Sequence, residues 1–415
     1  MLLISHPTGN TFVRALLEAA DQSKRLGLFA TALGFSGTPG WFGLLPASLR
    51  SELVRRCYDV SQDKMAISPL RETARLASRK LGWQGLSRHE TGWASVDSVY
   101  RHLDAGVAAE LPRWTREHAL TAAYAYEDGA LATLTAAKKL GLTAAYDLPI
   151  AYWQTVRRLL EEEAQRLPEW EPTLGSTQDS DEKLARKTAE LEAADFVVCP
   201  SQFVLDSIPE TLRAGRRCIV AEFGSPSGST KEKAPPKNRR IRFLFAGSMG
   251  QRKGLADVFA AFRLLKRSDI ELVVLGSLLM PLEFYRRHGG NFTYEPPRPH
   301  SEVLELMDSC DVLLLPSIAE GRALVQQEAM SRGLPIIVTR NAGGEDLVEE
   351  GRTGFLVPMR SPETLAERIN RVADHADQLP DMAREARRKA SEFSWAGYAA
   401  KIMAAVYPEN STQVR

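Results

Sequence analysis

The sequence contains only four cysteines in 415 residues, and none of them belongs to a CxxC pair. Such scattered thiols argue against a disulfide framework or a zinc site, and they favour reduced cysteines in a cytoplasmic protein. An excess of one charge is also missing, because 53 lysines and arginines oppose 52 aspartates and glutamates. The net charge of +1 gives no whole-chain electrostatic reason to bind nucleic acid.

Long apolar runs are absent as well. No stretch approaches the roughly 18 consecutive apolar residues of a membrane-spanning helix, and residues 1–5 are too short and too uncharged for a secretion signal. The composition, 44% hydrophobic and 25% charged, is that of an ordinary globular protein. Because one hydrophobic core stops growing at about 250–300 residues, the length predicts two domains.

Strand and helix patterns alternate in the first half of the chain. Residues 2–5, 11–22 and 26–33 resemble the strand, helix and strand of a parallel sheet. The alternation returns with strands at 120–126, 143–146, 196–199 and 218–222, and with helices at 129–140, 152–194 and 204–212. Between these parts, residues 49–80 are helical and basic, with eight lysines and arginines.

A polar, proline-rich segment without periodicity, residues 225–239, predicts a linker. After it, strand candidates at 242–246, 271–275, 311–315, 335–339 and 354–357 alternate with helical segments such as 255–265. We therefore predict an α/β protein with two doubly wound, Rossmann-like domains facing each other across a cleft. The predicted parts are a first domain at 1–223, a linker at 224–240, a second domain at 241–390, and a C-terminal helix at 391–415 that packs back on the first domain.

Two glutamates stand near the end of one predicted strand. Glu320 lies in the loop after strand 311–315, and Glu328 lies in the helix that follows. The carboxyl ends of parallel strands form ligand-binding crevices, and carboxylates accept hydrogen bonds from sugar and ribose hydroxyls. The pair predicts a nucleotide-sugar site; the alternative is that these glutamates only favour the helix dipole.

A glycine-bearing loop leads from strand 242–246 into helix 255–265. Gly247 and Gly250 permit close approach of a phosphate to the backbone, and Arg252 and Lys253 supply positive charge at the helix start. This arrangement predicts a diphosphate cradle, although a solvated basic helix start would look the same. A further loop with Gly343 and Gly344 follows strand 335–339 and converges on the same edge.

Three motifs together resemble retaining glycosyltransferases of family 4, which have the GT-B fold. Residues 316–358 resemble the E-x7-E signature of that family, and residues 243–254 resemble its diphosphate loop, which ends in Lys-Gly. Residues 193–203 resemble the last strand of its acceptor domain. The resemblance extends from about residue 124 to 407, with the acceptor domain first and the nucleotide-sugar domain second.

The resemblance implies roles for individual residues. Glu328 would hold the ribose hydroxyls, Glu320 a hydroxyl of the donor sugar, and Arg252 with Lys253 would neutralise the leaving diphosphate. Gly9 would approach the diphosphate from the first domain. The sugar pocket would be lined by backbone from two loops, comprising Gly321, Arg322, Ala323, Leu324, Gly343 and Gly344.

This sequence departs from the family pattern at three places. Arg322-Ala323 replaces a common Phe-Gly, which alters the sugar side of the loop. Ser248 stands where an arginine is frequent, so Arg252 is the expected substitute. Asp147 follows a strand at the place of a family histidine, which makes it a candidate catalytic contact to the sugar or acceptor.

Glu127 and Asp128 form a second acidic pair at a strand end. They are candidates for general-base work on an acceptor hydroxyl, although capping of helix 129–140 is the favoured reading. His6 is expected to finish a strand rather than meet the diphosphate. No His, Cys and carboxylate spacing indicates a metal site, and no cofactor is expected.

The function that the resemblance implies is retaining, metal-independent transfer of a sugar from a UDP- or GDP-sugar to the hydroxyl of a carbohydrate or lipid-linked acceptor. A nucleotide-sugar epimerase of the same architecture and a catalytically silent carbohydrate-binding relative remain alternatives. The basic stretch 49–80 adds peripheral contact with the inner face of the membrane as a further expectation, beside its reading as a solvated helical face.

Overall fold

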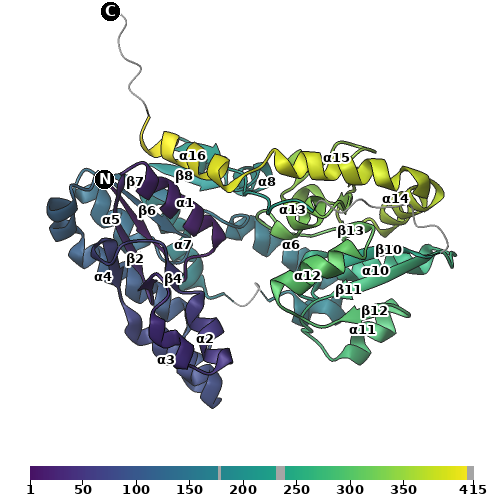
Figure 1. The fold of residues 1–415 in the computed structure, drawn as a ribbon, viewed down its shortest axis with the longest axis horizontal. Coiled ribbons are helices and arrows are strands. Elements are labelled where there is room, and N and C mark those ends of the chain that lie inside the picture. The colour runs from purple at the N-terminus through teal and green to yellow at the C-terminus, as the bar shows by residue number, and fades with distance from the viewer. Residues whose placement is uncertain (176–178, 230–238, 409–415) are drawn as a thin grey trace, which may run out of the picture.

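The computed structural model describes residues 1–175, 179–229 and 239–408, and its strands form two large parallel sheets (Figure 1). Most of the predicted linker 224–240 and the last seven residues of the predicted C-terminal segment lie outside the described residues. The seven-stranded sheet has the order β5 (Met65–Ile67), β2 (Leu26–Thr31), β1 (Leu2–Ser5), β6 (Ala122–Tyr126), β7 (Thr143–Asp147), β8 (Phe196–Cys199) and β9 (Arg217–Val220).

Both faces of this sheet are covered, because its central strands are buried along their whole length. One face packs on α1, and the other packs on α4 and α5. The helices of the first half are α1 (Thr11–Gln22), α2 (Ala47–Val54), α3 (Pro69–Leu81), α4 (Val96–His118), α5 (Leu131–Lys139), α6 (Trp153–Arg166), α7 (Asp181–Ala193), α8 (Gln202–Ser207) and α9 (Glu210–Arg213). A small parallel pair, β3 (Phe35–Ser36) and β4 (Cys57–Tyr58), stands apart from the sheet.

The six-stranded second sheet has the order β12 (Thr293–Glu295), β11 (Ile270–Leu275), β10 (Ile241–Ala246), β13 (Val312–Leu315), β14 (Ile336–Val338) and β15 (Gly354–Leu356). Five of these strands match the predicted positions to within one residue at each end, whereas the short edge strand β12 was not predicted. The helices of this half are α10 (Leu255–Leu264), α11 (Leu282–Gly289), α12 (His300–Asp308), α13 (Leu324–Ser331), α14 (Pro362–Asp374) and α15 (Leu379–Ser391).

The last helix returns to the first domain. α16 (Trp395–Val406) packs beside α1, and Tyr398, Ile402 and Val406 enter the core of that domain. Figure 1 shows this crossing, with α15 lying over the second sheet and α16 lying beside the first. Among the described residues, no helix is both long and apolar enough to cross a membrane.

The prediction of one helical stretch at 49–80 was wrong. The segment contains α2, β4, the 3-10 turn η2 (Gln62–Lys64), β5 and the greater part of α3. β5 pairs with β2 through Met65, Ala66 and Ile67 and so extends the first sheet. Three residues are too few to show a strand period, so their sheet partner decided their conformation.

The predicted helix 152–194 is also interrupted. It divides into α6 and α7, and a 3-10 segment η4 (Pro168–Thr173) follows the end of α6. Leu167 precedes Pro168, a position that disfavours helical backbone, and its φ of −133° and ψ of 70° lie outside the helical region. The interruption lets Trp170 enter the core of the second domain.

Candidate active site

An open pocket of about 520 Å³ lies at the carboxyl ends of β10 and β11. Four segments of the second domain surround it: the turn after β10, the end of β11, the loop before α12, and the start of α13. The lining residues that matter below are Gly247, Lys253, His300, Ala323, Leu324 and Glu328. This is the edge at which a doubly wound domain binds its ligand.

Gly247 and Lys253 form the positive side of this pocket. Gly247 has a φ of +146°, and a Cβ at this position would lie 2.7 Å from Cδ of Lys253. The glycine therefore lets the lysine side chain lie against the backbone of the turn. The 3-10 turn η6 (Gln251–Lys253) places both predicted cations just before α10.

Glu320 is held by these cations. Its Oε1 lies 2.7 Å from Nζ of Lys253 and 3.1 Å from a guanidinium nitrogen of Arg252. Burial opposes ionisation of the Glu320 carboxyl, but the charges of Lys253 and Arg252 prevail and hold its pKa below the usual value. Without a ligand, the carboxylate thus neutralises the two groups that were predicted to bind a diphosphate.

Glu328 has different surroundings, although it lies on the next helix. It lines the open pocket, and its nearest charged partner is His300, whose Nδ1 lies 3.9 Å from the Glu328 carboxylate. Burial raises the pKa of the Glu328 carboxyl, and the positive charge of His300 opposes that shift. The carboxylate is therefore available to hydroxyl donors in the pocket.

Two of the predicted donor-site glycines serve domain contacts instead. A Cβ at Gly250 would lie 2.8 Å from the carbonyl oxygen of Thr173, and one at Gly321 would lie 1.8 Å from that of Pro149. Ser201 also donates a 2.7 Å hydrogen bond to the Gly321 carbonyl. The prediction that these glycines face the ligand is wrong in this conformation, because segments of the first half fill that space.

Arg322 was predicted to line the sugar pocket, and this prediction is wrong. Its guanidinium is buried and donates to Gln327 at 3.0 Å, to the carbonyl of Gly343 at 3.1 Å and to Asp346 at 2.7 Å. It also lies over the ring of Phe393. The buried Arg322 guanidinium therefore stabilises its own loop through hydrogen bonds and does not face the pocket.

The other predicted residues of these two loops have one of two roles: they line the first pocket, or they pack against other protein atoms. Ala323 and Leu324 line the first pocket. Gly343 packs on the loop of residue 321, since a Cβ there would lie 1.9 Å from a carbonyl oxygen, and Gly344 packs on the side chain of Gln326. The turn with both glycines supports the pocket without lining it.

A second pocket, of about 670 Å³, opens on the first domain at the start of α1. Gly9 lines it, and His6 shapes the turn because its Nδ1 accepts the N–H groups of Thr8 and Gly9 at 3.1 and 2.9 Å. Burial lowers the pKa of His6 to about 3, so the ring is a neutral acceptor. Arg55 and Leu324 line both pockets, which therefore adjoin each other across the two domains.

Asp147 does not face either pocket. It is 1% exposed, and its Oδ2 accepts hydrogen bonds from the hydroxyls of Tyr124 at 2.5 Å and Tyr398 at 3.3 Å. Burial raises the pKa of its carboxyl to about 7, although both hydroxyls favour the charged form. The predicted contact to sugar or acceptor is contradicted in this conformation, since Asp147 joins α16 to the first sheet.

Glu127 and Asp128 do not cap the following helix, so the favoured reading was wrong. Asp104, on α4, accepts the N–H groups of the first turn of α5. Glu127 is buried beside Lys187, 3.4 Å away, and burial raises its pKa to about 7 while the lysine opposes the shift. Asp128 has a φ of +73° and gives its backbone N–H to Glu190.

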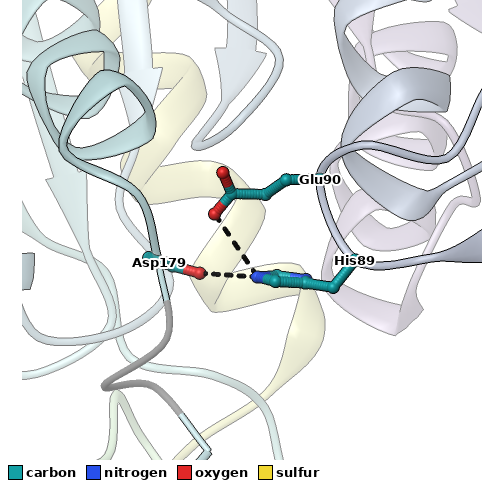
Figure 2. A group of neighbouring side chains, drawn as sticks. All are labelled: His89, Glu90 and Asp179. Carbon is teal, nitrogen blue, oxygen red and sulfur yellow. Dashed lines mark hydrogen bonds and ion pairs between the residues drawn. The ribbon is translucent and has the colours of Figure 1, made fainter.

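Within the residues that the structure describes, three side chains of the kinds that bind metal ions lie together, which sequence spacing does not reveal. His89, Glu90 and Asp179 each offer one ligand atom, and these atoms lie within 4.8 Å of one another. Figure 2 shows the carboxylates of Glu90 and Asp179 turned toward the His89 ring. However, Asp179 already accepts a 2.9 Å hydrogen bond from the ammonium of Lys183, which neutralises that carboxylate. The arrangement fits an ion-pair cluster of the protein's own side chains.

Sequence reasoning missed several lining residues of the first pocket. The loop from Pro297 to His300 closes one side, and Ser248, Ser277 and Arg55 contribute as well. The Pro-Arg-Pro-His run was a usable signal, because prolines are typical of a loop at a strand end. The strand before this run, β12, has only three residues, which are too few to show the period of a strand.

Comparison with known proteins finds one family model that matches part of the second half. Residues 228–389 match the family model described as "Glycosyl transferases group 1". D-inositol 3-phosphate glycosyltransferase of Paenarthrobacter aurescens (strain TC1) is 31% identical over 166 residues, which are 37% of this chain and 41% of that protein. The chain matches only about a quarter to a little over half of the length of such curated relatives.

Solved structures match nearly the whole chain. Sucrose-phosphate synthase from Thermosynechococcus elongatus has a TM-score of 0.66 at 15% identity, covering 97% of each chain. Anabaena HepE in complex with UDP-glucose has a TM-score of 0.60 at 16% identity, covering 98% of each chain. These likenesses, together with the two parallel sheets, confirm the predicted GT-B fold.

Proposed function

We propose that this protein is a glycosyltransferase that moves a sugar from a nucleoside diphosphate sugar to an acceptor hydroxyl with retention and without a metal ion. The observation that carries the proposal is the first pocket, in which Lys253, the Gly247 turn and Glu328 meet at the carboxyl ends of β10 and β11. The family match of residues 228–389 supports the reaction class. Anabaena HepE binds UDP-glucose, so UDP-sugars are the first donors to test.

The Glu320 ion pairs suggest how the donor enters. A diphosphate that reaches Gly247 takes Lys253 and Arg252 as counter-charges, and Glu320 then turns toward the hydroxyls of the sugar. Both cations stabilise the negative charge that develops on the leaving diphosphate, which is the work a divalent ion does in other enzymes. Glu328 accepts from the ribose hydroxyls.

The first domain supplies the acceptor side. The pocket at the start of α1 adjoins the donor pocket through Arg55 and Leu324, so an acceptor held there lies next to the bound sugar. Closure of the cleft would bring the Gly9 turn toward the diphosphate and exclude water that would hydrolyse the donor. Retention follows from front-face attack, in which the leaving diphosphate receives the acceptor proton.

Donor binding tests the site directly. We expect UDP- or GDP-sugar to raise the thermal midpoint of the wild-type protein, by an amount equivalent to about 2.7 kcal/mol at 100 times the dissociation constant. Glu328→Ala should weaken that affinity by about tenfold or more, because it removes a charge-assisted acceptor. Glu305→Ala, on the exposed side of α12, is the matched control and should bind normally. Unchanged affinity of the Glu328 variant would exclude the assignment.

Product analysis separates the alternatives. A nucleotide-sugar epimerase would convert the donor without an acceptor, and a silent carbohydrate-binding relative would convert nothing. We expect a new glycoside only when donor and acceptor are both present, with the anomeric configuration of the donor in its NMR spectrum. Inversion, or donor conversion alone, would contradict the proposed reaction.

A further inference from the structure

The pocket at the start of α1 is lined by an excess of positive charge. Arg14, Arg55 and Arg56 line it, whereas Glu52 is the one carboxylate among the described residues of its wall. Binding pockets are usually lined by apolar side chains with a few polar groups that match the polar groups of the ligand. Three arginines in one wall therefore carry information about the ligand.

The Glu52 carboxylate is already paired. It accepts a 2.8 Å hydrogen bond from Arg56, and Arg56 also donates to the buried Glu72 at 2.6 Å. Glu72 in turn accepts from Arg75 at 2.7 and 2.8 Å. In this cluster, two carboxylates balance two guanidinium groups, so it does not compensate further positive charge.

Arg14 and Arg55 form no ion pair within residues 1–175, 179–229 and 239–408. Arg14 donates to the backbone carbonyls of Arg55 and Cys57, the latter at 2.6 Å, and its guanidinium lies 4.5 Å from the centre of the Tyr58 ring. These contacts fix the Arg14 side chain and the backbone of Arg55, but carbonyls and a ring carry no net charge. The exposed Arg55 guanidinium is thus held at the pocket with its charge unpaired.

Two further groups of hydrogen-bond donors belong to the same pocket. Arg56 is 5% exposed, and its Nε has no hydrogen-bond partner in the part of the chain that the structure describes. The first turn of α1 contains no acidic side chain, and Asn10 at its N-cap makes no side-chain hydrogen bond to it. Guanidinium nitrogens and the N–H groups of a helix start are both donors that suit an oxyanion.

The place of these arginines favours the acceptor over the donor. Arg14 and Arg56 line the pocket at the start of α1 and do not line the first pocket, where Lys253 and the Gly247 turn stand. Arg55 lines both pockets, so an anion that it binds lies beside the donor pocket. The positive wall therefore belongs to the molecule that occupies the first domain.

We propose that the acceptor carries an anionic group, a phosphate or a carboxylate, which Arg55, Arg56 and the start of α1 bind. This inference rests on the proposed function, because it names the substrate class of the proposed acceptor site. The anion holds the acceptor at the border of the two pockets, and an uncharged acceptor of the same shape binds more weakly.

Phosphate binding in the presence of UDP tests the proposal on the full chain. Saturating UDP, or GDP if the wild type binds only that nucleotide, fills the donor pocket, so that inorganic phosphate added at constant ionic strength reports the pocket at the start of α1. We expect phosphate to raise the thermal midpoint further, and Arg55→Ala to weaken the phosphate affinity by about tenfold. Arg50→Ala, at an exposed arginine of α2 that lines neither pocket, is the matched control and should bind phosphate as the wild type does.

The comparison of the two variants removes the general stabilising effect of phosphate, which is excluded from protein surfaces in both of them alike. Both replaced side chains are exposed, so the thermal midpoints without ligand should equal that of the wild type.

The possible results separate this inference from the proposed function. A wild type that binds neither UDP nor GDP would refute the proposed function, and this inference with it. Nucleotide binding without a phosphate site beside it, or with equal phosphate affinity in Arg55→Ala and Arg50→Ala, would overturn this inference alone. A tenfold loss of UDP affinity in Arg55→Ala with an unchanged phosphate affinity would assign Arg55 to the donor diphosphate instead.

Discussion

Glu320 and Glu328 stand eight residues apart, yet their surroundings give them opposite properties. The pKa of Glu320 is lowered because Lys253 and Arg252 overcome the effect of burial, whereas the pKa of Glu328 is raised because only His300 opposes burial. The Glu320 carboxylate is paired with two cations, so a ligand must displace these ion pairs before it can bind to Glu320. The Glu328 carboxylate faces an open pocket and can accept a hydrogen bond from a ligand directly. The sequence signature names both residues and cannot assign these different states.

Asp147 gives a pH prediction at the residue scale. Its folded pKa of about 7 lies above its ordinary value of 3.8, so the folded state keeps a proton that the unfolded state has lost. The stability it contributes is fully present below about pH 4 and declines as the pH rises to about 7, by at most about 1.4 kcal/mol per pH unit. Asp147→Asn should remove this decline, because the amide oxygen still accepts from Tyr124 and Tyr398.

Urea unfolding of both proteins between pH 4 and 8 measures the difference. The variant should be the more stable protein at pH 7.5 and should retain donor binding and transfer. A variant with an unchanged pH profile would show that Asp147 is ionised in the fold. Loss of transfer with stability intact would restore the catalytic role that its burial argues against.

At the scale of elements, η4 is one of the parts that join the two halves of the chain. Trp170 is 2% exposed, and its ring lies 4.9 Å from that of Phe284 and 5.8 Å from that of Tyr285. These partners belong to α11 of the second domain, while η4 follows α6 in sequence. The folded second domain therefore includes a side chain from the first half.

Trp170→Ala should destabilise the protein by about 3–5 kcal/mol, because it leaves a cavity among aromatic rings. The exposed Trp83→Ala is the matched control and should change the free energy of unfolding by less than about 0.5 kcal/mol. Chemical denaturation followed by circular dichroism gives both values. Equal stability of the two variants would show that η4 does not contribute to the core of the second domain.

For the whole molecule, Glu163 is the centre of the contact between domains. It is fully buried near the end of α6, and its carboxylate accepts from Gln251 at 2.7 Å and from Arg360 at 2.7 Å. Both partners belong to the second domain, and Arg166 adds a further bond from the same helix. One buried side chain thus joins α6 to two segments of the second domain.

Glu163→Gln should cost about 1.5–3 kcal/mol, because the neutral amide weakens the charge-assisted hydrogen bonds that the buried carboxylate accepts from Arg360 and Arg166. Glu162→Gln is the control, since Glu162 binds the same Arg360 from a position whose side chain is 41% exposed, and it should cost less than about 1 kcal/mol. Denaturant unfolding measures both. If the two variants are equally stable, the buried carboxylate does not hold the domains together.

The sequence by itself determined the two doubly wound domains and the place of the first pocket, at the carboxyl ends of strands in the second domain. Apolar strands alternating with helices specify parallel sheets, and the positions of Gly247, Lys253 and Glu328 in the segments that follow β10 and β13 result from that alternation. Such patterns are local, because residues of one strand, turn or helix lie close together in the chain. They also located five of the six strands of the second sheet to within one residue at each end.

Only the tertiary structure decided which residues face the ligand and which face the protein. Arg322, Gly250 and Gly321 fit the sequence pattern of a sugar site, but partners from distant parts of the chain bury them. The burial of Asp147 depends in the same way on its contact with Tyr398 of α16. Burial is a property of pairs of segments that meet only after folding, so a pattern within one segment cannot specify it.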